Sequence, residues 1–300
     1  MSAQLYFSNS PAVLLDKLSG NLEWSDPFLS PHIATPTPAM KRWVQMRLAE
    51  KRGIVANVDF MQLERTLWQR LEELDLEHVV EGRKPARILD EQGLQLLILG
   101  LLRSDPPPEA REYLERTGPE AAQGMLYARR LCQLSRKLAG FFREYEYSRV
   151  QEHGHAGLAH LWMRGEDCFG AYLDGQVPKA ARDQLRSLER WQKRIYHALF
   201  RVGGLRDSLG ETLGQYRYTL PQYAEMVLNQ ARAPADPDRK PPGYHLFGLS
   251  QISPFHRSLI RRLADKEALR GRQARFFIYS LNPCAEYWED VLTPGERLRQ

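Results

Sequence analysis

One local pattern occurs four times in this chain and limits the folds that it can adopt. A short β-like run leads to Ser, Thr or Asn, then to Pro, and then to an amphipathic stretch. Ser, Thr and Asn cap helix N-termini, and Pro suits the first helical position because its missing N–H costs nothing there. Strands that alternate with capped helices predict a mainly parallel α/β sheet. The strand and helix segments are 5–7 with 12–18, 32–34 with 39–51, 244–249 with 255–263, and 274–281 with 285–291.

The middle of the chain has a different pattern, with apolar residues at helical spacing and Pro- or Gly-rich breakers between the segments. We therefore expect a parallel-sheet α/β domain, made from both ends of the chain and interrupted by a large all-helical insertion. The predicted limits are 1–62 and 241–300 for the α/β domain and 63–240 for the insertion. The predicted helices of the middle are 64–76, 90–103, 124–145 and 179–202, and a further strand is predicted at 54–60.

Composition narrows the cellular setting and the class of partner. The chain has 42 Lys and Arg against 37 Asp and Glu, a net charge of +5 that permits a polyanionic partner without requiring one. Its three cysteines are odd in number and widely spaced, which favours reduced thiols over a disulfide framework. The N-terminus shows no targeting pattern, and the apolar run at 96–102 is far shorter than the ~20 residues that cross a bilayer. We expect a soluble cytoplasmic protein.

The ends of the predicted strands lack the residues of an ATP site. Ligands bind beyond the carboxyl ends of parallel strands, where an ATPase of the P-loop type has G-x-x-x-x-G-K followed by Ser or Thr. Residues 7–13 instead read F-S-N-S-P-A-V, and the next lysine, Lys17, lies in the following helix. The strand at 244–249 ends without an acidic pair for Mg²⁺. We expect no ATPase activity and no cofactor in this chain.

Other catalytic patterns are weak. One segment gathers three histidines and a cysteine, but their spacing fits no common zinc template, and exposed loop histidines are the favoured alternative. Cys284 follows Pro283 at a predicted helix start, where the helix dipole would lower a thiol pKa, yet a small buried residue is favoured there. No metal site is therefore assigned. The residues of the segment are His153, His155, His160 and Cys168.

Better-placed features suit nucleic acid. Thr35 and Thr37 lead into Arg42 at a predicted helix N-terminus. Free N–H groups, the positive end of the helix dipole and basic side chains together suit a phosphate. Gln62 and Trp68 follow the next strand, and an exposed tryptophan would stack on a base. These five residues are the predicted DNA contacts.

Core packing competes with these roles. For Trp68 the core and the DNA alternatives are evenly matched. For Trp43 the core is favoured, because the residue shares an apolar stripe with Val44 and Leu48. The basic clusters at 129–130, 136–137 and 261–262 are interpreted as solvated helix faces.

Three stretches match the motifs of a known family. Residues 39–46 read A-M-K-R-W-V-Q-M and residues 53–60 read G-I-V-A-N-V-D-F, similar to a helix ending in W-L-Q-M and a strand G-I-A-A-N-I-D-F. Residues 281–290 read L-N-P-C-A-E-Y-W-E-D, similar to N-P-C-x-x-Y-W-x-D, and residues 6–10 read Y-F-S-N-S, similar to Y-H-S-N-R. On these motifs, whose order and spacing cover nearly the whole chain, the sequence resembles the N-terminal region of the RecC family, the gamma subunits of exodeoxyribonuclease V.

The resemblance implies a helicase-like first motor domain without an ATP-binding motif. It also implies a non-catalytic role in double-strand-break repair: holding RecB-like and RecD-like motors, handling single-stranded and forked duplex DNA, and scanning for a Chi sequence. Nuclease activity in the family belongs to RecB, so the resemblance implies no nuclease activity in this chain. Trp68 matches the family's tryptophan after the strand, whereas Pro36, Pro38 and Arg42 depart from the family's residues. Because these subunits are several times longer, we expect an N-terminal fragment.

Two alternatives from other functional classes stay open. The first is a helical protein-interaction module with little intrinsic DNA binding, which a salt titration of DNA binding would distinguish. The second is a metal-dependent hydrolase that uses the segment 153–168, which metal analysis of a tag-free sample would test.

Overall fold

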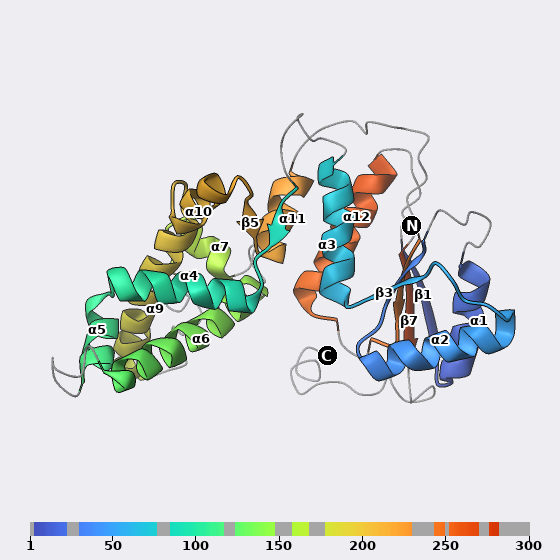
Figure 1. Cartoon of the computed structure of the whole chain (residues 1–300), viewed down its shortest axis with the longest axis horizontal. Helices are drawn as coiled ribbons and strands as arrows, with labels where there is room; N and C mark the ends of the chain where they lie inside the picture. Colours follow the sequence, from blue (N-terminus) through green and yellow to red (C-terminus); the bar gives the residue numbers. More distant parts are fainter. Residues whose placement is uncertain are drawn as a thin grey trace. The chain divides into compact units, whose positions relative to one another are not determined.

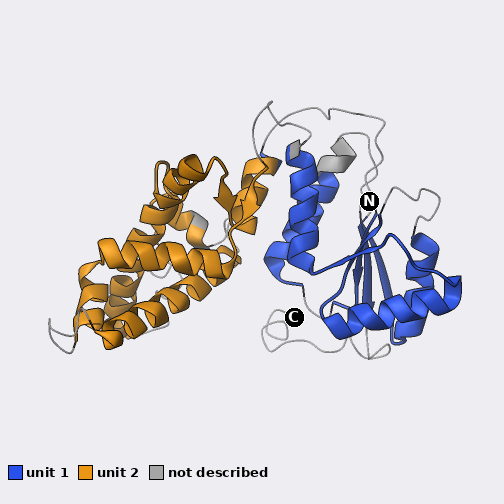
Figure 2. Cartoon of the chain, viewed as in Figure 1, with its two compact units in different colours: residues 1–78, 228–300 blue, residues 79–227 orange. Residues whose placement is uncertain are grey.

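In the computed structural model, strands from both ends of the chain form one sheet (Figure 1). The structure describes residues 3–22, 30–76, 85–116, 124–147, 158–167, 178–229, 243–249, 252–269 and 276–281. Contacts within the chain define two compact units, which Figure 2 colours separately: unit 1, residues 1–78 and 228–300, and unit 2, residues 79–227. The domain limits at 62/63 and 240/241 stay a prediction.

The sheet of unit 1 has five described strands, and every pairing between them is parallel, as the repeated strand–helix pattern predicted. Their order is β1-β7-β6-β2-β3, so that the two late strands lie between β1 and β2. Because the strands all run in one direction, their carboxyl ends share one edge of the sheet. The strands are β1 (Ala3–Ser8), β2 (His32–Ala34), β3 (Asp59–Met61), β6 (Tyr244–Phe247) and β7 (Phe276–Leu281).

Helices cover both faces of this sheet (Figure 1). Helices α1 (Pro11–Asn21) and α2 (Pro38–Arg52) lie on one face, and α3 (Leu63–Leu76) and α12 (Pro254–Leu269) lie on the other. The central strand β6 is buried along its whole length, as expected of a parallel strand that helices cover on both faces. The core under α1 and α2 includes Leu14, Leu18, Ile33, Val44, Leu48, Phe247 and Tyr279.

Three of the four predicted strand–helix units are confirmed, and the helix predicted at 285–291 lies outside the described residues. The strand predicted at 54–60 is shorter and later, because β3 starts only at Asp59. Its neighbour β2 is three residues long and offers partners only from His32 to Ala34. Ile54, which the strand prediction included, is 79% exposed.

Unit 2 is mainly helical. The predicted helical segments correspond to α3 of unit 1 and to α4, α6 and α9 of unit 2, whereas α5, α7, α10 and α11 were not predicted. The expectation of an all-helical insertion is corrected by a two-stranded parallel sheet of β4 (Arg87–Ile88) and β5 (Arg217–Tyr218), whose strands are too short to leave a periodic pattern. The helices are α4 (Glu91–Ser104), α5 (Pro108–Glu115), α6 (Met125–Tyr147), α7 (Leu158–Met163), α9 (Lys179–Phe200), α10 (Leu205–Leu213) and α11 (Leu220–Leu228).

Aromatic residues from three helices form the centre of the unit 2 core. Phe142 of α6 contacts Trp162 of α7 and Tyr196 of α9 edge-on, with ring centroids 6.2 and 5.4 Å apart. All three side chains are buried.

Among the described helices, none combines the length and the apolar character that a membrane crossing needs.

Candidate nucleic-acid interface

The carboxyl edge of the sheet of unit 1 brings helix N-termini together. α1, α2, α3 and α12 each follow a strand whose carboxyl end lies at this edge. The first turns of a helix leave backbone N–H groups without helical partners and carry the positive end of the dipole. The connection from β1 to α1 consists of only Asn9 and Ser10, and Ser10 N donates to Ser8 Oγ at 3.1 Å. That turn is too short to wrap a nucleotide phosphate as a P-loop does.

Thr35 and Thr37 fix the turn that follows β2. Thr35 N donates to Met61 O at 3.0 Å, and the residue is 4% exposed, so that its side chain lies inside the unit. Thr37 is exposed, and its Oγ1 accepts from Met40 N at 3.2 Å, which caps α2 as the sequence predicted. Thr37 thus lies at the surface where a phosphate would approach, whereas Thr35 positions the backbone behind it.

Two basic residues follow in the first turns of α2. Lys41 Nζ lies 5.7 Å from the centroid of the Phe60 ring. Arg42 is exposed and forms no ion pair with any residue that the structure describes. Trp43 is partly buried and stacks on Phe247 with ring centroids 6.2 Å apart, which confirms the core assignment favoured for it.

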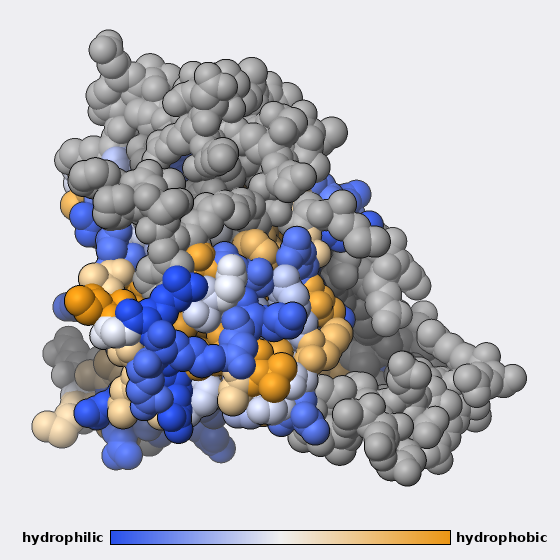
Figure 3. Space-filling model, turned by 90° about the vertical axis from the view of Figure 1, so that its right-hand side faces the viewer, coloured by the Kyte–Doolittle hydropathy of each residue, from blue (hydrophilic) through white to orange (hydrophobic). Residues whose placement is uncertain are grey.

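In the face of unit 1 that Figure 3 shows, hydrophilic residues dominate the described surface and hydrophobic residues form smaller areas between them.

Gln62 and Trp68 have opposite environments. Gln62 is exposed at the start of α3. Its backbone carbonyl oxygen accepts hydrogen bonds from Thr66 N at 3.0 Å and from Thr66 Oγ1 at 3.1 Å. Trp68 has 0% exposure and packs within the unit beside Leu67 and Leu71, which are equally buried. The structure thus places Trp68 in the core, where a base cannot reach the indole, and its contact with DNA stays a prediction.

Packing between elements holds the edge in place. Gly248, after β6, has φ +70°, and a Cβ there would lie 3.3 Å from Met40 Cε of α2. At the start of α12, Ser253 Oγ accepts from His256 N at 3.3 Å and lies 2.8 Å from His256 Nδ1. His256 Nε2 in turn lies 4.0 Å from Glu64 Oε1 of α3. The starts of α3 and α12 are thus connected to each other, and α2 packs against the turn that follows β6.

Sequence reasoning missed a polar cluster at the opposite, amino edge of the sheet. His32 Nδ1 lies 3.5 Å from Asp59 Oδ2, and Tyr244 OH donates to Glu73 Oε2 at 2.6 Å. Burial lowers the pKa of His32, and the carboxylates of Glu73 and Asp59 oppose this shift. These residues come from β2, β3, β6 and α3, so their proximity follows only from the strand order. His32 and Tyr244 are buried, which suits a structural role.

Most residues of the candidate metal-binding segment lie outside the part of the chain that the structure describes. His153, His155 and Cys168 lie outside the described residues, as does the side chain of His160. Cys284, the thiol at a predicted helix start, lies outside them too. Within the described ranges, no group of three His, Cys, Asp or Glu side chains is placed to hold a metal ion.

Comparison with known proteins agrees with the sequence motifs. A family model described as "RecC, N-terminal domain" matches residues 4–300. The RecBCD enzyme subunit RecC of Haemophilus influenzae is 24% identical over 297 residues, which cover 96% of this chain and 24% of that protein. The RecBCD enzyme subunit RecC of Escherichia coli is 24% identical over 300 residues, which cover 97% of this chain and 22% of that protein. The chain thus spans about a quarter of the length of these curated relatives, and it belongs to the RecC N-terminal domain family.

Proposed function

We propose that this chain is a non-catalytic DNA-handling and scaffold segment of a RecC-type subunit within a RecBCD-type helicase–nuclease. Its partners in this proposal are RecB-like and RecD-like motor subunits and the strands of a forked duplex. The membership in the RecC N-terminal domain family supports the assignment to such a complex. The absence of a Gly- and Lys-containing loop after β1 supports a framework that resembles a helicase motor but does not hydrolyse ATP.

The observation that carries the DNA contact is the carboxyl edge of the sheet. There the N-terminus of α2 combines an exposed cap, Thr37, with Lys41 and with Arg42, which forms no ion pair with any described residue. Gln62 is exposed at the neighbouring start of α3 and offers an amide that can bond to a base or a sugar. In this proposal phosphates lie at the start of α2, while Thr35 and Trp68 support the surface from inside. Scanning for a Chi-like sequence would use the same edge.

Fluorescence anisotropy with a labelled single strand and a labelled fork, titrated across salt, tests the proposal. Phosphate contacts release counterions, so we expect affinity to fall steeply as salt rises. Arg42→Ala should remove about one phosphate contact and lower the salt slope on a single strand by about 0.7. Lys17→Ala, an exposed lysine of α1, is the matched control and should leave the slope unchanged. DNA-stimulated ATP hydrolysis by the purified chain, or equal effects of the two substitutions, would contradict the proposal.

A further inference from the structure

Strand β1, at one edge of the described sheet, has one covered face and one uncovered face. Tyr6 points toward α1, where its ring stacks on Tyr279 with centroids 5.2 Å apart and packs against the core. Leu5 and Phe7 point to the other side, because neighbouring residues of a strand alternate between its faces. Their side chains are 52% and 62% exposed. An apolar face on an edge strand invites unwanted association unless something covers it.

The uncovered face lies on the side of the sheet that carries α3 and α12. Leu5 pairs in register with Ile278, and Ile278 pairs with Leu246, so these three side chains share one face. Leu246 lies two residues from Tyr244, which contacts Glu73 of α3. Leu246 is buried and Ile278 is half-buried, so the cover ends between β6 and β1. Strands are about 4.8 Å apart and packed helices about 9 Å apart, so two helices cover roughly four strands and leave room for a third helix over β1.

The path of the chain favours this face for a helix that follows β7. From β6 through α12 to β7, the chain moves one strand along the sheet, toward β1. Crossovers between parallel strands are right-handed, so helices that connect strands in one direction share one face. α1 and α2 connect strands in the opposite direction and lie on the opposite face, where α1 already packs on β1 and β7. A helix after β7 therefore has room on the face of Leu5 and Phe7 and not on the face of α1.

Residues 283–292, which follow β7 after Asn282, have the pattern that such a helix needs. They read P-C-A-E-Y-W-E-D-V-L, with Pro at the first helical position. Five apolar residues recur at helical spacing and would form one stripe, whereas the opposite side would carry three acids and no basic residue. The residues of the stripe are Cys284, Tyr287, Trp288, Val291 and Leu292.

The dimensions and charge of this segment match the uncovered face. Ten helical residues rise about 15 Å, and the six residues of β1 extend about 20 Å. Cys284 and Trp288 would be about 6 Å apart along a helix, close to the roughly 6.6 Å between Phe7 and Leu5 along β1. On α12, which covers the adjacent part of this face, Arg257 is exposed and forms no ion pair with any described residue. The acidic side of the segment would therefore lie next to a basic helix.

We propose that residues 283–292 form a helix whose apolar stripe covers Leu5 and Phe7. The helix begins at the carboxyl edge of the sheet and runs back along β1, so that Cys284 lies near Phe7 and Trp288 near Leu5. This gives the apolar residues of the N-P-C-x-x-Y-W-x-D motif a structural task, which is to complete the core of unit 1. The proposal involves no DNA, so its failure would leave the proposed function standing. A second copy of the chain and a partner protein are the competing occupants.

Disulfide trapping tests where the segment lies. In a chain that carries Cys132→Ser and Cys168→Ser, Phe7→Cys adds a thiol that mild oxidation should join to Cys284 within one chain. Mass spectrometry of the digested protein identifies the bond. Val13→Cys is the matched control, because Val13 is 49% exposed at the start of α1, on the opposite face, and should form no bond.

The other outcomes of the trapping experiment identify the competing occupants. A bond between two chains would assign the face to a second copy. A thiol at position 7 that stays free would show that the segment does not reach β1 and would leave the face to a partner protein. Either result would overturn the proposal.

Denaturant unfolding tests whether the two surfaces pack together. Phe7→Ala and Trp288→Ala should each lower the urea midpoint, and the double variant should lower it by less than the sum, because residues in contact are energetically coupled. Phe7→Ala combined with Met46→Ala is the control, since Met46 is exposed on α2, on the other face, and the two losses should add. Additive losses for Phe7 and Trp288 would contradict the proposed contact.

Discussion

At the residue scale, the buried carboxyl group of Glu146 controls how the stability of unit 2 depends on pH. Glu146 Oε1 accepts from Tyr196 OH at 2.7 Å and from Gln222 Nε2 at 2.8 Å. Burial raises the pKa of Glu146 to about 7, although these hydrogen bonds oppose the shift. The folded chain therefore binds more protons than the unfolded chain between pH 4.5, the ordinary pKa, and about 7. The free energy of unfolding should fall across that interval as pH rises.

Glu146→Gln should remove this dependence, because glutamine keeps the accepting oxygen and carries no charge. A shift of this size corresponds to on the order of 3 kcal/mol between the two pH values. We expect urea unfolding to show the parent chain losing stability from pH 5 to pH 8 and the variant losing far less. At pH 8 the variant should be the more stable of the two. Parallel pH profiles for both chains would refute this account of Glu146.

The burial of Trp68 could have been predicted from the sequence. Leu67, Leu71 and Leu74 recur around it at helical spacing, and all of them are buried with it in α3. The sequence analysis left the core and DNA roles of Trp68 evenly matched, because the family's tryptophan at this position favoured a DNA contact while the periodicity favoured the core. The burial of Thr35 could not be predicted in this way. It follows from the pairing of β2 with β3, which the local sequence does not encode.

At the scale of elements, the caps of α1 and α2 allow a matched comparison. Both helices begin with Pro after a hydroxyl residue, but only Thr37 accepts a side-chain capping bond, whereas Ser10 makes none. We expect Thr37→Ala to reduce the free energy of unfolding by about 1 kcal/mol and Ser10→Ala to leave it nearly unchanged. Denaturant unfolding measures both. Equal losses would show that the difference between the two caps has no energetic effect.

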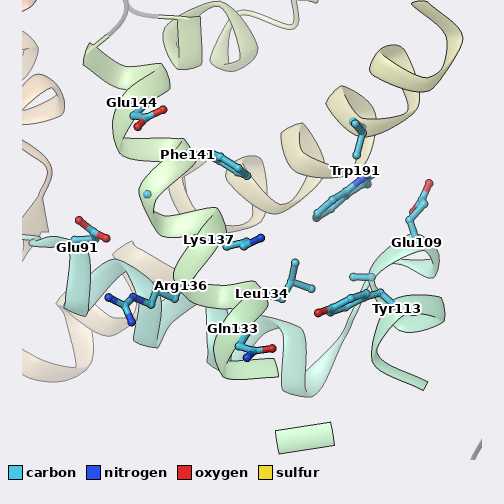
Figure 4. Close-up of a pocket in the computed structure, with 13 residues that line it drawn as sticks. Glu91, Glu109, Tyr113, Gln133, Leu134, Arg136, Lys137, Phe141, Glu144 and Trp191 are labelled. Carbon is cyan, nitrogen blue, oxygen red and sulfur yellow. The ribbon is translucent and has the colours of Figure 1, made fainter. Parts of the chain in front are cut away.

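Local pattern predicted the elements whose signals are strong and missed those that depend on tertiary context. The strand–Pro–helix pattern gave the parallel sheet and its carboxyl edge. α5 was missed because the prolines at 106–108 were interpreted as a break, although Pro108 is the first residue of that helix. The hollow that Tyr113, Phe141 and Trp191 line (Figure 4) could not be foreseen, since these residues come from helices whose packing no local period determines.

At the scale of the whole molecule, the self-contained core of unit 2 indicates how the chain is built. Leu94, Ile98, Leu138, Phe142 and Leu199 belong to one cluster whose members all come from residues 79–227. A hydrophobic core drawn from one unit alone is what a part of a chain needs to fold independently. We therefore predict that residues 79–227 expressed alone are helical and unfold cooperatively on heating, as circular dichroism would record.

Phe142→Ala supplies the internal control for that experiment. The Phe142 side chain is fully buried against Trp162 and Tyr196, so truncation should cost about 3–5 kcal/mol. A cooperative transition in the fragment that this substitution lowers or abolishes would mean that the core of unit 2 suffices for folding. A fragment without a transition, beside a full chain that has one, would instead mean that unit 2 draws its stability from the remaining residues.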